Sequence, residues 1–205
     1  MGEGYGPMII SKEKMTVEEA KNKVFAIPGV GTSAYLSLRL ALGDVDYRVV
    51  PFDEIMPSVK SGEYDVGVII HEGQLTWKNE GVNLVLDLGI WWNEKTGLPL
   101  PLGGNVVRKD LGLEMCGKIT EDVRNSIEHS LSNPEDALEF AKEWGRGIDD
   151  ETNEEFVGMY VNKRTLDYGD DGREAIRLFL RKGQEIGMVR SNLDVDSIVF
   201  VGSGE

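Results

Sequence analysis

The stretch Val68-Ile69-Ile70-His71-Glu72 is a short apolar run that ends at one of the two histidines of the chain. It follows Gly62 and stops at Gly73, and a run of this length between glycines is typical of a buried strand in an α/β sheet. Ligands of open α/β sheets bind beyond the carboxyl ends of the strands. His71 is therefore expected where a ligand would be met, and its imidazole titrates near neutral pH.

The sequence on both sides of this run alternates between strand-like and helix-like segments. Alternation of this kind predicts parallel strands joined by right-handed crossovers. The expected strands are 8–11, 23–27, 46–50, 65–70 and 84–86, and the expected helices are 16–21, 34–42 and 53–61.

The segment Leu98-Pro99-Leu100-Pro101-Leu102-Gly103-Gly104 interrupts this alternation, and we interpret it as a crossover between two lobes that feeds a strand at 105–108. We predict an α/β fold of two lobes with a cleft between them, the architecture of type II periplasmic-binding proteins. Lobe one would comprise residues 1–15 and 104–205, and lobe two residues 16–103. Helices are expected in the remainder at 120–132, 133–144, 150–160 and 172–186.

The charge of the chain excludes two classes of partner. Acidic residues outnumber basic ones by 36 to 22, which gives a formal net charge of −14. An acidic surface repels the phosphates of nucleic acids and anionic membranes. An anionic substrate would therefore have to be captured locally, by backbone amides or hydroxyl groups.

Cysteine content and the distribution of apolar residues bear on the cellular location. Cys116 is the single cysteine, so neither an internal disulfide nor a cysteine-based metal site is expected. No apolar stretch of about 18 residues is present, and residues 1–7 lack the features of a signal peptide. These observations favour a cytoplasmic protein.

The loop Pro28-Gly29-Val30-Gly31-Thr32-Ser33-Ala34 precedes a predicted helix and could bind an anion. Amides at a helix start have no intrahelical partner and lie at the positive end of the helix dipole, so they favour a carboxylate or a phosphate. The hydroxyl groups of Thr32 and Ser33 would add donors. An ordinary helix cap is the alternative. The lysine of a Walker loop is absent, which disfavours nucleoside triphosphates.

His71 could act as a general base, or it could only satisfy backbone groups at the end of a strand. Glu72 is a poor candidate to orient it, because neighbouring strand residues point to opposite faces. His129 lies within a predicted helix and is expected to face solvent. The pair Trp91-Trp92 could stack on an aromatic ligand, or it could only pack the lobe or the hinge. No cluster has the spacing of metal ligands, so no metal is expected.

Several motifs occur together in this chain and carry a resemblance that covers nearly its whole length. They are Gly4–Pro7, Pro28–Gly29 with Thr32–Tyr35, Phe52–Pro57, Gly67–Glu72, Asp87–Gly89, Trp91–Trp92, Thr96–Gly104 and Tyr160–Asn162. With these motifs the chain resembles the menaquinone-biosynthesis family of the futalosine pathway. The resemblance is stronger to its 1,4-dihydroxy-6-naphthoate synthase branch than to its chorismate dehydratase branch.

The resemblance implies a cytosolic carbon–carbon lyase on a periplasmic-binding-protein fold. Such an enzyme would convert cyclic dehypoxanthine futalosine to 1,4-dihydroxy-6-naphthoate and release a three-carbon fragment. It implies His71 as the catalytic base and Thr32, Ser33 and Ala34 as the residues that hold a small carboxylate substrate. It implies no metal and no organic cofactor.

The chain departs from the family at two places. Gly73 and Gln74 stand where the family usually has serine and arginine, so the substrate could differ. The family also has an amino-terminal segment that builds the opening part of lobe one, and nothing here corresponds to it. Two further hypotheses therefore stay open: a small-carboxylate binding protein without catalysis, and a half-protein that needs an amino-terminal partner chain. Association into a homodimer is a further expectation.

Overall fold

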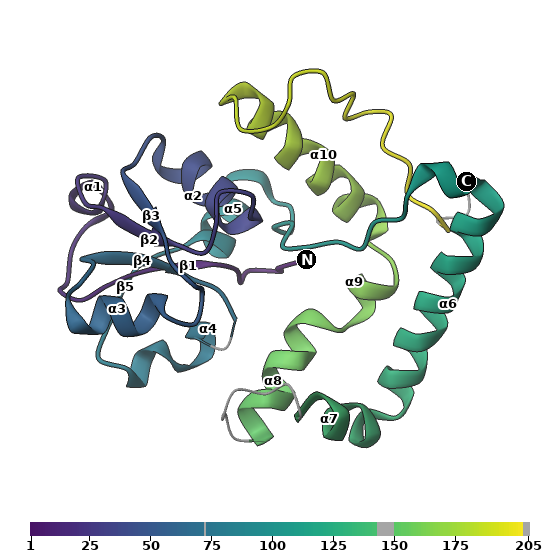
Figure 1. Cartoon of the computed structure of the whole chain (residues 1–205), viewed down its shortest axis with the longest axis horizontal. Helices are drawn as coiled ribbons and strands as arrows, with labels where there is room; N and C mark the ends of the chain where they lie inside the picture. Colours follow the sequence, from purple (N-terminus) through teal and green to yellow (C-terminus); the bar gives the residue numbers. More distant parts are fainter. Residues whose placement is uncertain (72, 143–149, 203–205) are drawn as a thin grey trace.

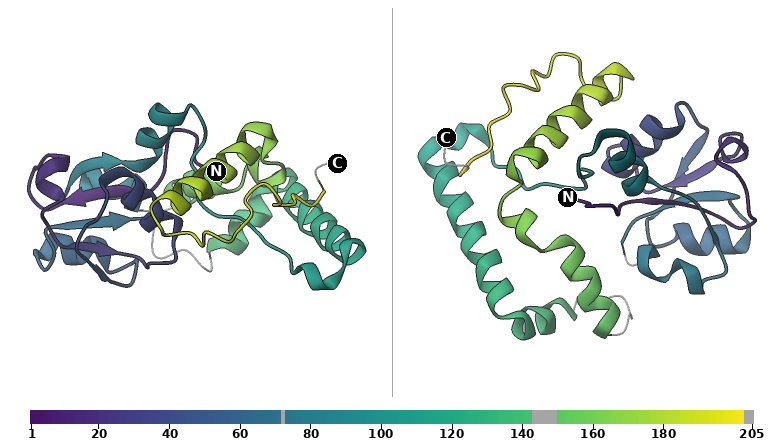
Figure 2. Two further views of the ribbon diagram at one scale, coloured as in Figure 1. Left: turned by 90° about the horizontal axis from the view of Figure 1, so that it is seen from above. Right: turned by 180° about the vertical axis from the view of Figure 1, so that it is seen from behind.

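The computed structural model describes residues 1–71, 73–142 and 150–202 of the chain. A sheet with its helices forms one side of the molecule, and a frame of longer helices forms the other (Figure 1). The amino terminus lies between the two parts, and the extended residues 101–108 lead from the sheet part to the helical frame (Figures 1 and 2). We call residues 8–97 the sheet part and residues 109–185 the helical part.

The sheet part contains five strands in the order β3-β2-β4-β1-β5. β2 pairs in parallel with both β3 and β4, whereas β1 pairs antiparallel with β4 and with β5. The strands are β1 Met8–Ser11, β2 Phe25–Ile27, β3 Tyr47–Val49, β4 Val66–Ile69 and β5 Asn83–Asp87.

Local sequence signals define the helices between these strands. Thr16 and Glu19 form a capping box at the start of α1, Gly43 ends α2, and Gly62 ends α3 in the left-handed conformation. The helices of the sheet part are α1 Val17–Ala20, α2 Ser33–Leu42, α3 Ile55–Ser61, α4 Gly73–Thr76 and α5 Leu88–Thr96, with a short 3-10 helix η1 at Trp77–Asn79.

The helical part follows the crossover. It comprises a 3-10 helix η2 at Lys109–Leu111, then α6 Leu113–Ser132, α7 Pro134–Lys142, α8 Asp150–Tyr160, α9 Lys163–Leu166 and α10 Gly169–Glu185. The four helices expected here are confirmed as α6, α7, α8 and α10, although α6 starts at Leu113, with Gly112 as its N-cap, and not at Thr120. The expected end of α7 near Trp144 falls outside the described residues. His129 is exposed on α6, as predicted.

Helices cover both faces of the sheet, which explains why β4 is apolar at every position. On one face Phe25, Ile27 and Val68 pack with Tyr35 and Leu38 of α2. On the other face Ala26 and Ile69 pack with Ile55 and Val59 of α3. The α/β class predicted from the sequence is confirmed. A third cluster joins α10 to α2 and α5 through Leu36, Trp92, Leu100 and Phe179.

The first strand differs from its expected place. Residues 8–11 were grouped with 104–205, but β1 lies between β4 and β5 in the sheet, where Ile9 pairs with Val68 and with Leu86. Its antiparallel pairing also departs from the all-parallel expectation. The chain enters from residues 1–7 at the carboxyl ends of β4 and β5, so β1 must run against them. The remaining boundary of the two lobes stays a prediction.

The strand expected at 105–108 does not form. These residues are extended without sheet pairing, and Val106 is 98% exposed. A strand needs a partner for its backbone N–H and C=O groups, and the described part of the chain places none beside this segment. The valines there give local β propensity but no sheet.

Candidate functional site

The carboxyl ends of β2 and β4 form the topological switch point of the sheet. From β2 the chain passes through α2 to β3 on one side, and from β3 it returns through α3 to β4 on the other side of β2. The two connections diverge at the ends of β2 and β4, and open α/β sheets bind ligands at such a point. Both predicted site segments follow these two strands.

The helix start beyond β2 offers two backbone amides. Thr32 is the N-cap of α2, and its Oγ1 accepts from the amide of Tyr35 at 3.1 Å and donates to the carbonyl of Gly29 at 2.7 Å. Ser33 donates its hydroxyl to the carbonyl of Leu102. Both hydroxyl groups thus have protein partners, whereas the amides of Ser33 and Ala34 are the first two of the helix and have no intrahelical acceptor.

His71 follows β4 in an unusual backbone conformation. Its φ of 68° makes it the one residue other than glycine with a positive φ in the described part of the chain. A residue with a Cβ atom pays about 1–2 kcal/mol in this region, and such strain gathers at functional sites. The His71 ring lies 4.3 Å from the Phe52 ring and 6.2 Å from the Phe156 ring, measured between centroids.

The structure brings His71 and the helix start to the same edge of the sheet. β2 and β4 are adjacent and parallel, with Phe25 opposite Val66, and adjacent strands lie about 4.8 Å apart. His71 is half-buried between aromatic rings from both parts of the molecule. Its role as base and the roles of Thr32, Ser33 and Ala34 stay predictions. Glu72 lies outside the described residues.

Gln74 lies at the same edge, and it was noted in the sequence only as a departure from the family pattern. Its side chain is 4% exposed, and its Nε2 lies 3.0 Å from the hydroxyl of Tyr160 in α8. When the amide is turned so that every neighbour is satisfied, its nitrogen donates to the carbonyl of Gly6, and its oxygen accepts from Tyr160 and from the amide of His71. The departure of Gln74 from the family pattern marked the position as unusual. Its contacts with Gly6 and Tyr160 could not be predicted, because both residues are distant in the sequence.

Trp91 and Trp92 lie in α5, a helix that was not among the elements predicted from the sequence. Trp92 is 1% exposed, its Nε1 donates to the carbonyl of Pro99 at 3.1 Å, and its ring meets Phe179 edge to face. Trp92 therefore packs between α5, the crossover and α10, in agreement with the alternative that the tryptophans serve packing. The Asp87 side chain caps α5 through the amides of Gly89 and Ile90.

Asp87 is the buried carboxyl group of the same sheet edge. Desolvation raises its pKa above the usual value, and the hydrogen bonds from the amides of Ile90 and Gly89 oppose this rise. These two amides hold the carboxylate in place, so its structural role as a helix cap explains its burial.

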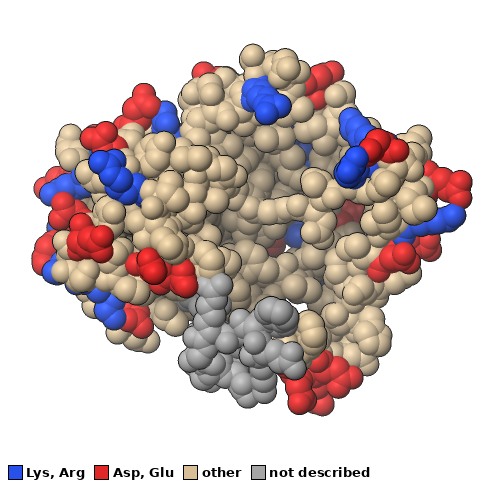
Figure 3. Space-filling view, viewed as in Figure 1, with Lys and Arg blue, Asp and Glu red and all other residues tan. Residues whose placement is uncertain are grey.

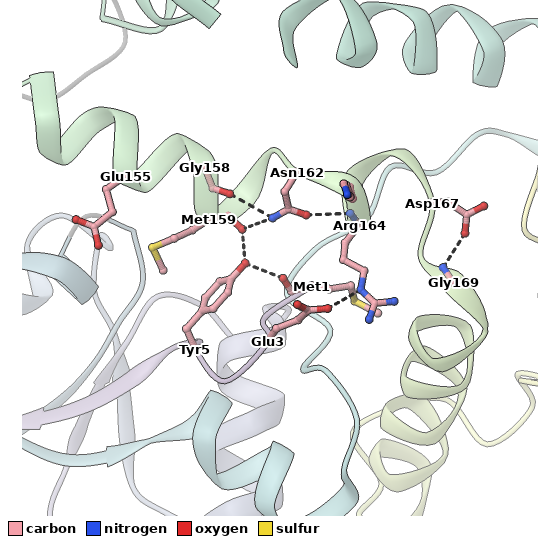
Figure 4. A pocket seen from close by; sticks show the side chains of 11 residues that line it. Met1, Glu3, Tyr5, Glu155, Gly158, Met159, Asn162, Arg164, Asp167 and Gly169 are labelled. Atoms are coloured by element: carbon pink, nitrogen blue, oxygen red, sulfur yellow. Dashed lines mark hydrogen bonds and ion pairs between the residues drawn. The ribbon is translucent and has the colours of Figure 1, made fainter. Parts of the chain in front are cut away.

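The molecule is hollowed between its two parts, and its charged side chains gather mainly at the flanks of the face shown in Figure 3. A pocket of about 860 Å³ lies beside Tyr5, Met159 and Arg164, and none of the predicted site residues lines it (Figure 4). Its polar groups have protein partners: Arg164 pairs with Glu3 and with the neighbouring Asp171, and the Tyr5 hydroxyl lies within hydrogen-bond distance of the carbonyls of Met1 and Met159. This pocket is a seam between residues 1–5 and α8–α9, and we place the site at the switch point instead.

The described ranges give no sign of a membrane span or of a metal site. No helix there is both long and apolar enough to cross a membrane. Among the same residues, no three histidine, cysteine or acidic side chains gather in a way that could hold a metal ion. The expectation that no metal or cofactor is needed stays a prediction.

Comparison with solved structures supports the fold predicted from the sequence. A crystal structure of a protein from Archaeoglobus fulgidus matches with a TM-score of 0.87 and 37% identity, over 92% of this chain and 70% of that one. A periplasmic sulfonate-binding protein, SsuA from Methylobacillus flagellatus, matches with a TM-score of 0.62 and 15% identity, over 95% of this chain and 63% of that one. The second match shows the periplasmic-binding-protein fold alone.

Comparison with known sequences agrees with the family predicted above. A protein named 1,4-dihydroxy-6-naphtoate synthase from Streptomyces coelicolor is 33% identical over 98% of this chain and 72% of its own length. The protein of that name from Thermus thermophilus is 40% identical over 87% of this chain, which spans 65% of that relative. The family model for menaquinone biosynthesis matches residues 1–185. The chain therefore belongs to the menaquinone-biosynthesis family.

Proposed function

We propose that this chain contributes to a carbon–carbon lyase that converts cyclic dehypoxanthine futalosine to 1,4-dihydroxy-6-naphthoate. The observation that carries the proposal is the placement of His71 and the start of α2 at the switch point of one sheet. The names of the two relatives, both 1,4-dihydroxy-6-naphtoate synthases, support the product.

The proposed roles follow from the chemistry of the groups at this edge. The amides of Ser33 and Ala34 bind the substrate carboxylate, aided by the positive end of α2. Neutral His71 takes a proton from the substrate, and the electron pair left behind drives cleavage of the carbon–carbon bond that frees the three-carbon fragment. Thr32 acts as the cap that holds the helix start in place, and the Phe52 ring limits the orientations of the imidazole.

The test removes the imidazole without changing the backbone. Asparagine tolerates the left-handed conformation better than alanine, so His71→Asn keeps the turn after β4 while it deletes the base. The kcat for naphthoate release should fall about 10²–10⁴-fold. His129→Asn, on the exposed face of α6, is the matched control. If His71→Asn retains kcat within about threefold of that control, His71 is not the base.

We also propose that activity requires a further polypeptide segment of the kind the relatives possess. α6, all of whose residues are described, buries only Cys116, while Leu113 is 83% and Phe140 in α7 66% exposed. Exposed apolar side chains on neighbouring helices are typical of a face that another segment or chain covers. The chain also spans only 72% and 65% of the two relatives.

Co-expression tests this requirement. The partner would be the portion of the Thermus thermophilus relative that this chain does not match. Co-purification with a gain of naphthoate release would support the proposal, and Leu113→Glu should weaken the complex because it places a charge in the covered face. Full activity of the chain as a monomer would contradict it. Calorimetry with the substrate distinguishes a binding protein, which would bind without turnover.

A further inference from the structure

Gln74 is a buried polar side chain at the candidate site that the proposed chemistry does not use. It lies in α4, directly after the turn that holds His71, and it contacts three segments that are distant in the sequence. Its amide nitrogen donates to the carbonyl of Gly6 at 3.0 Å, and its amide oxygen accepts from the hydroxyl of Tyr160 at 3.0 Å and from the amide of His71 at 3.3 Å. Its own backbone amide donates to the carbonyl of His71 at 3.0 Å.

Gln74 thus binds both the N–H and the C=O of His71, a residue whose backbone conformation is energetically unfavourable. His71 has a φ of 68°, which side chains with a Cβ atom rarely adopt and which neighbouring contacts must stabilise. The bonds to its N–H and to its C=O both come from Gln74. Because the direction of the imidazole follows from this backbone, a change at Gln74 is transmitted to the ring.

α8 contacts the same histidine by two routes. Phe156 and Tyr160 lie four residues apart and so share a face of α8, with ring centroids 4.9 Å apart. The Phe156 ring meets the His71 ring, and the Tyr160 hydroxyl meets the amide of Gln74. The position of α8 therefore acts on the ring of His71 directly and on its backbone through Gln74.

We propose that Gln74 is a positioning residue for His71, and that it couples the orientation of the imidazole to the docking of α8 through Tyr160. The kinetic consequence rests on the proposed function, whereas the structural coupling does not. Gln74 touches no reacting atom in this scheme and acts through the backbone of His71.

Four variants test the proposal. Gln74→Met keeps the length of the side chain and removes its polar atoms, and Tyr160→Phe removes one hydroxyl group. The double variant joins the two changes. Gln184→Met is the matched control, because Gln184 in α10 likewise donates to backbone carbonyls, those of Arg190 and Leu193, away from the sheet edge.

The first readout is the NMR signal of His71, which is simple to follow because the chain has two histidines. Gln74→Met and Tyr160→Phe should shift or broaden the His71 backbone amide and ring signals, while the His129 signals stay in place as an internal reference. Gln184→Met should leave all of them unchanged. The second readout is kinetic: Gln74→Met should lower kcat for naphthoate release about 10–100-fold with KM within about threefold, because it misplaces a group instead of removing a binding contact.

The double variant separates coupling from two independent effects. If Gln74 and Tyr160 act through one contact, Gln74→Met with Tyr160→Phe should lower kcat little further than Gln74→Met alone. A His71 signal in Gln74→Met that matches the Gln184→Met control, or multiplicative kinetic losses in the double variant, would overturn the proposal. Should Gln74→Met not fold, an unchanged His71 signal in folded Tyr160→Phe overturns the coupling by itself. Loss of the proposed function, seen when His71→Asn stays active, would leave the NMR prediction standing.

Discussion

Gly89 lies where two backbones touch, and its replacement by alanine should be costly. It is the second residue of α5, and a Cβ atom built on it would lie 2.1 Å from the carbonyl carbon and oxygen of Tyr5 and 2.6 Å from the nitrogen of Gly6. These atoms are main chain, so they cannot move aside as a side chain can. Gly89→Ala must therefore push residues 5–6 away from α5.

The expected loss follows from two opposing contributions. Alanine in place of glycine within a helix gains at most about 1 kcal/mol of stability. Overpacking in a dense region costs about 1–3 kcal/mol, and three main-chain atoms of one peptide group within 2.6 Å favour the upper end. The net loss for Gly89→Ala is thus about 2 kcal/mol, which corresponds to a fall in Tm of about 4–8 °C for a chain of this length.

Gly117 provides the matched control for this prediction. It lies within α6, and a Cβ atom built there would meet nothing within 4 Å. Gly117→Ala should therefore stabilise the protein by about 0.5–1 kcal/mol through helix propensity alone. Urea unfolding followed by circular dichroism measures both variants. If Gly89→Ala is as stable as the wild type, or changes stability in the same direction as Gly117→Ala, the inferred contact between α5 and residues 5–6 is wrong.

Two further substitutions test the packing and the electrostatics of the same edge. Trp92→Phe should lower the free energy of unfolding by about 2 kcal/mol, because it leaves the buried carbonyl of Pro99 without its donor, and a loss below about 0.5 kcal/mol in urea unfolding would contradict this. Asp87→Asn tests the raised pKa of Asp87. A raised pKa means that the folded state binds the proton more tightly than the unfolded state. The wild type therefore loses stability as the pH rises from the unfolded pKa through the folded pKa. Asparagine keeps the cap without the charge, so the free energy of unfolding of Asp87→Asn relative to the wild type should rise as the pH increases above about 4, and a pH-independent difference would show that the pKa of Asp87 is not perturbed.

The sequence predicted those elements whose signals are local. The apolar run of β4 lies as expected, and the helices expected to end at residues 42 and 61 do end there, with Gly43 and Gly62 as their C-caps. α5 was missed although Asp87 and Gly97 give it a cap at each end. The two tryptophans suggested a ligand contact, whereas the capping residues Asp87 and Gly97 indicate a helix between them.

Features that depend on distant pairing could not be predicted. The valines at 106–107 have β propensity but no partner strand, so the segment stays extended and exposed. The place of β1 within the sheet depends on pairing with β4 and β5, which its own residues do not specify. At the site, the edge shared by His71 and the helix start follows from α/β topology, whereas the contact between Gln74 and Tyr160 spans 86 residues.

The carbonyl of Gly6 links the stability of the molecule to the geometry of its site. Gly6 packs against Gly89 of α5, and its carbonyl accepts from Gln74, which binds the backbone of His71. A displacement of residues 5–6 should thus reach the imidazole, whereas the polar and ring partners of Trp92 are Pro99 and Phe179, which take no part in these hydrogen bonds. Gly89→Ala should therefore shift the His71 NMR signals and Trp92→Phe should not, although both lower the free energy of unfolding by about 2 kcal/mol. Equal shifts in the two variants would mean that general loosening, and not the Gly6–Gln74–His71 chain of contacts, controls the ring.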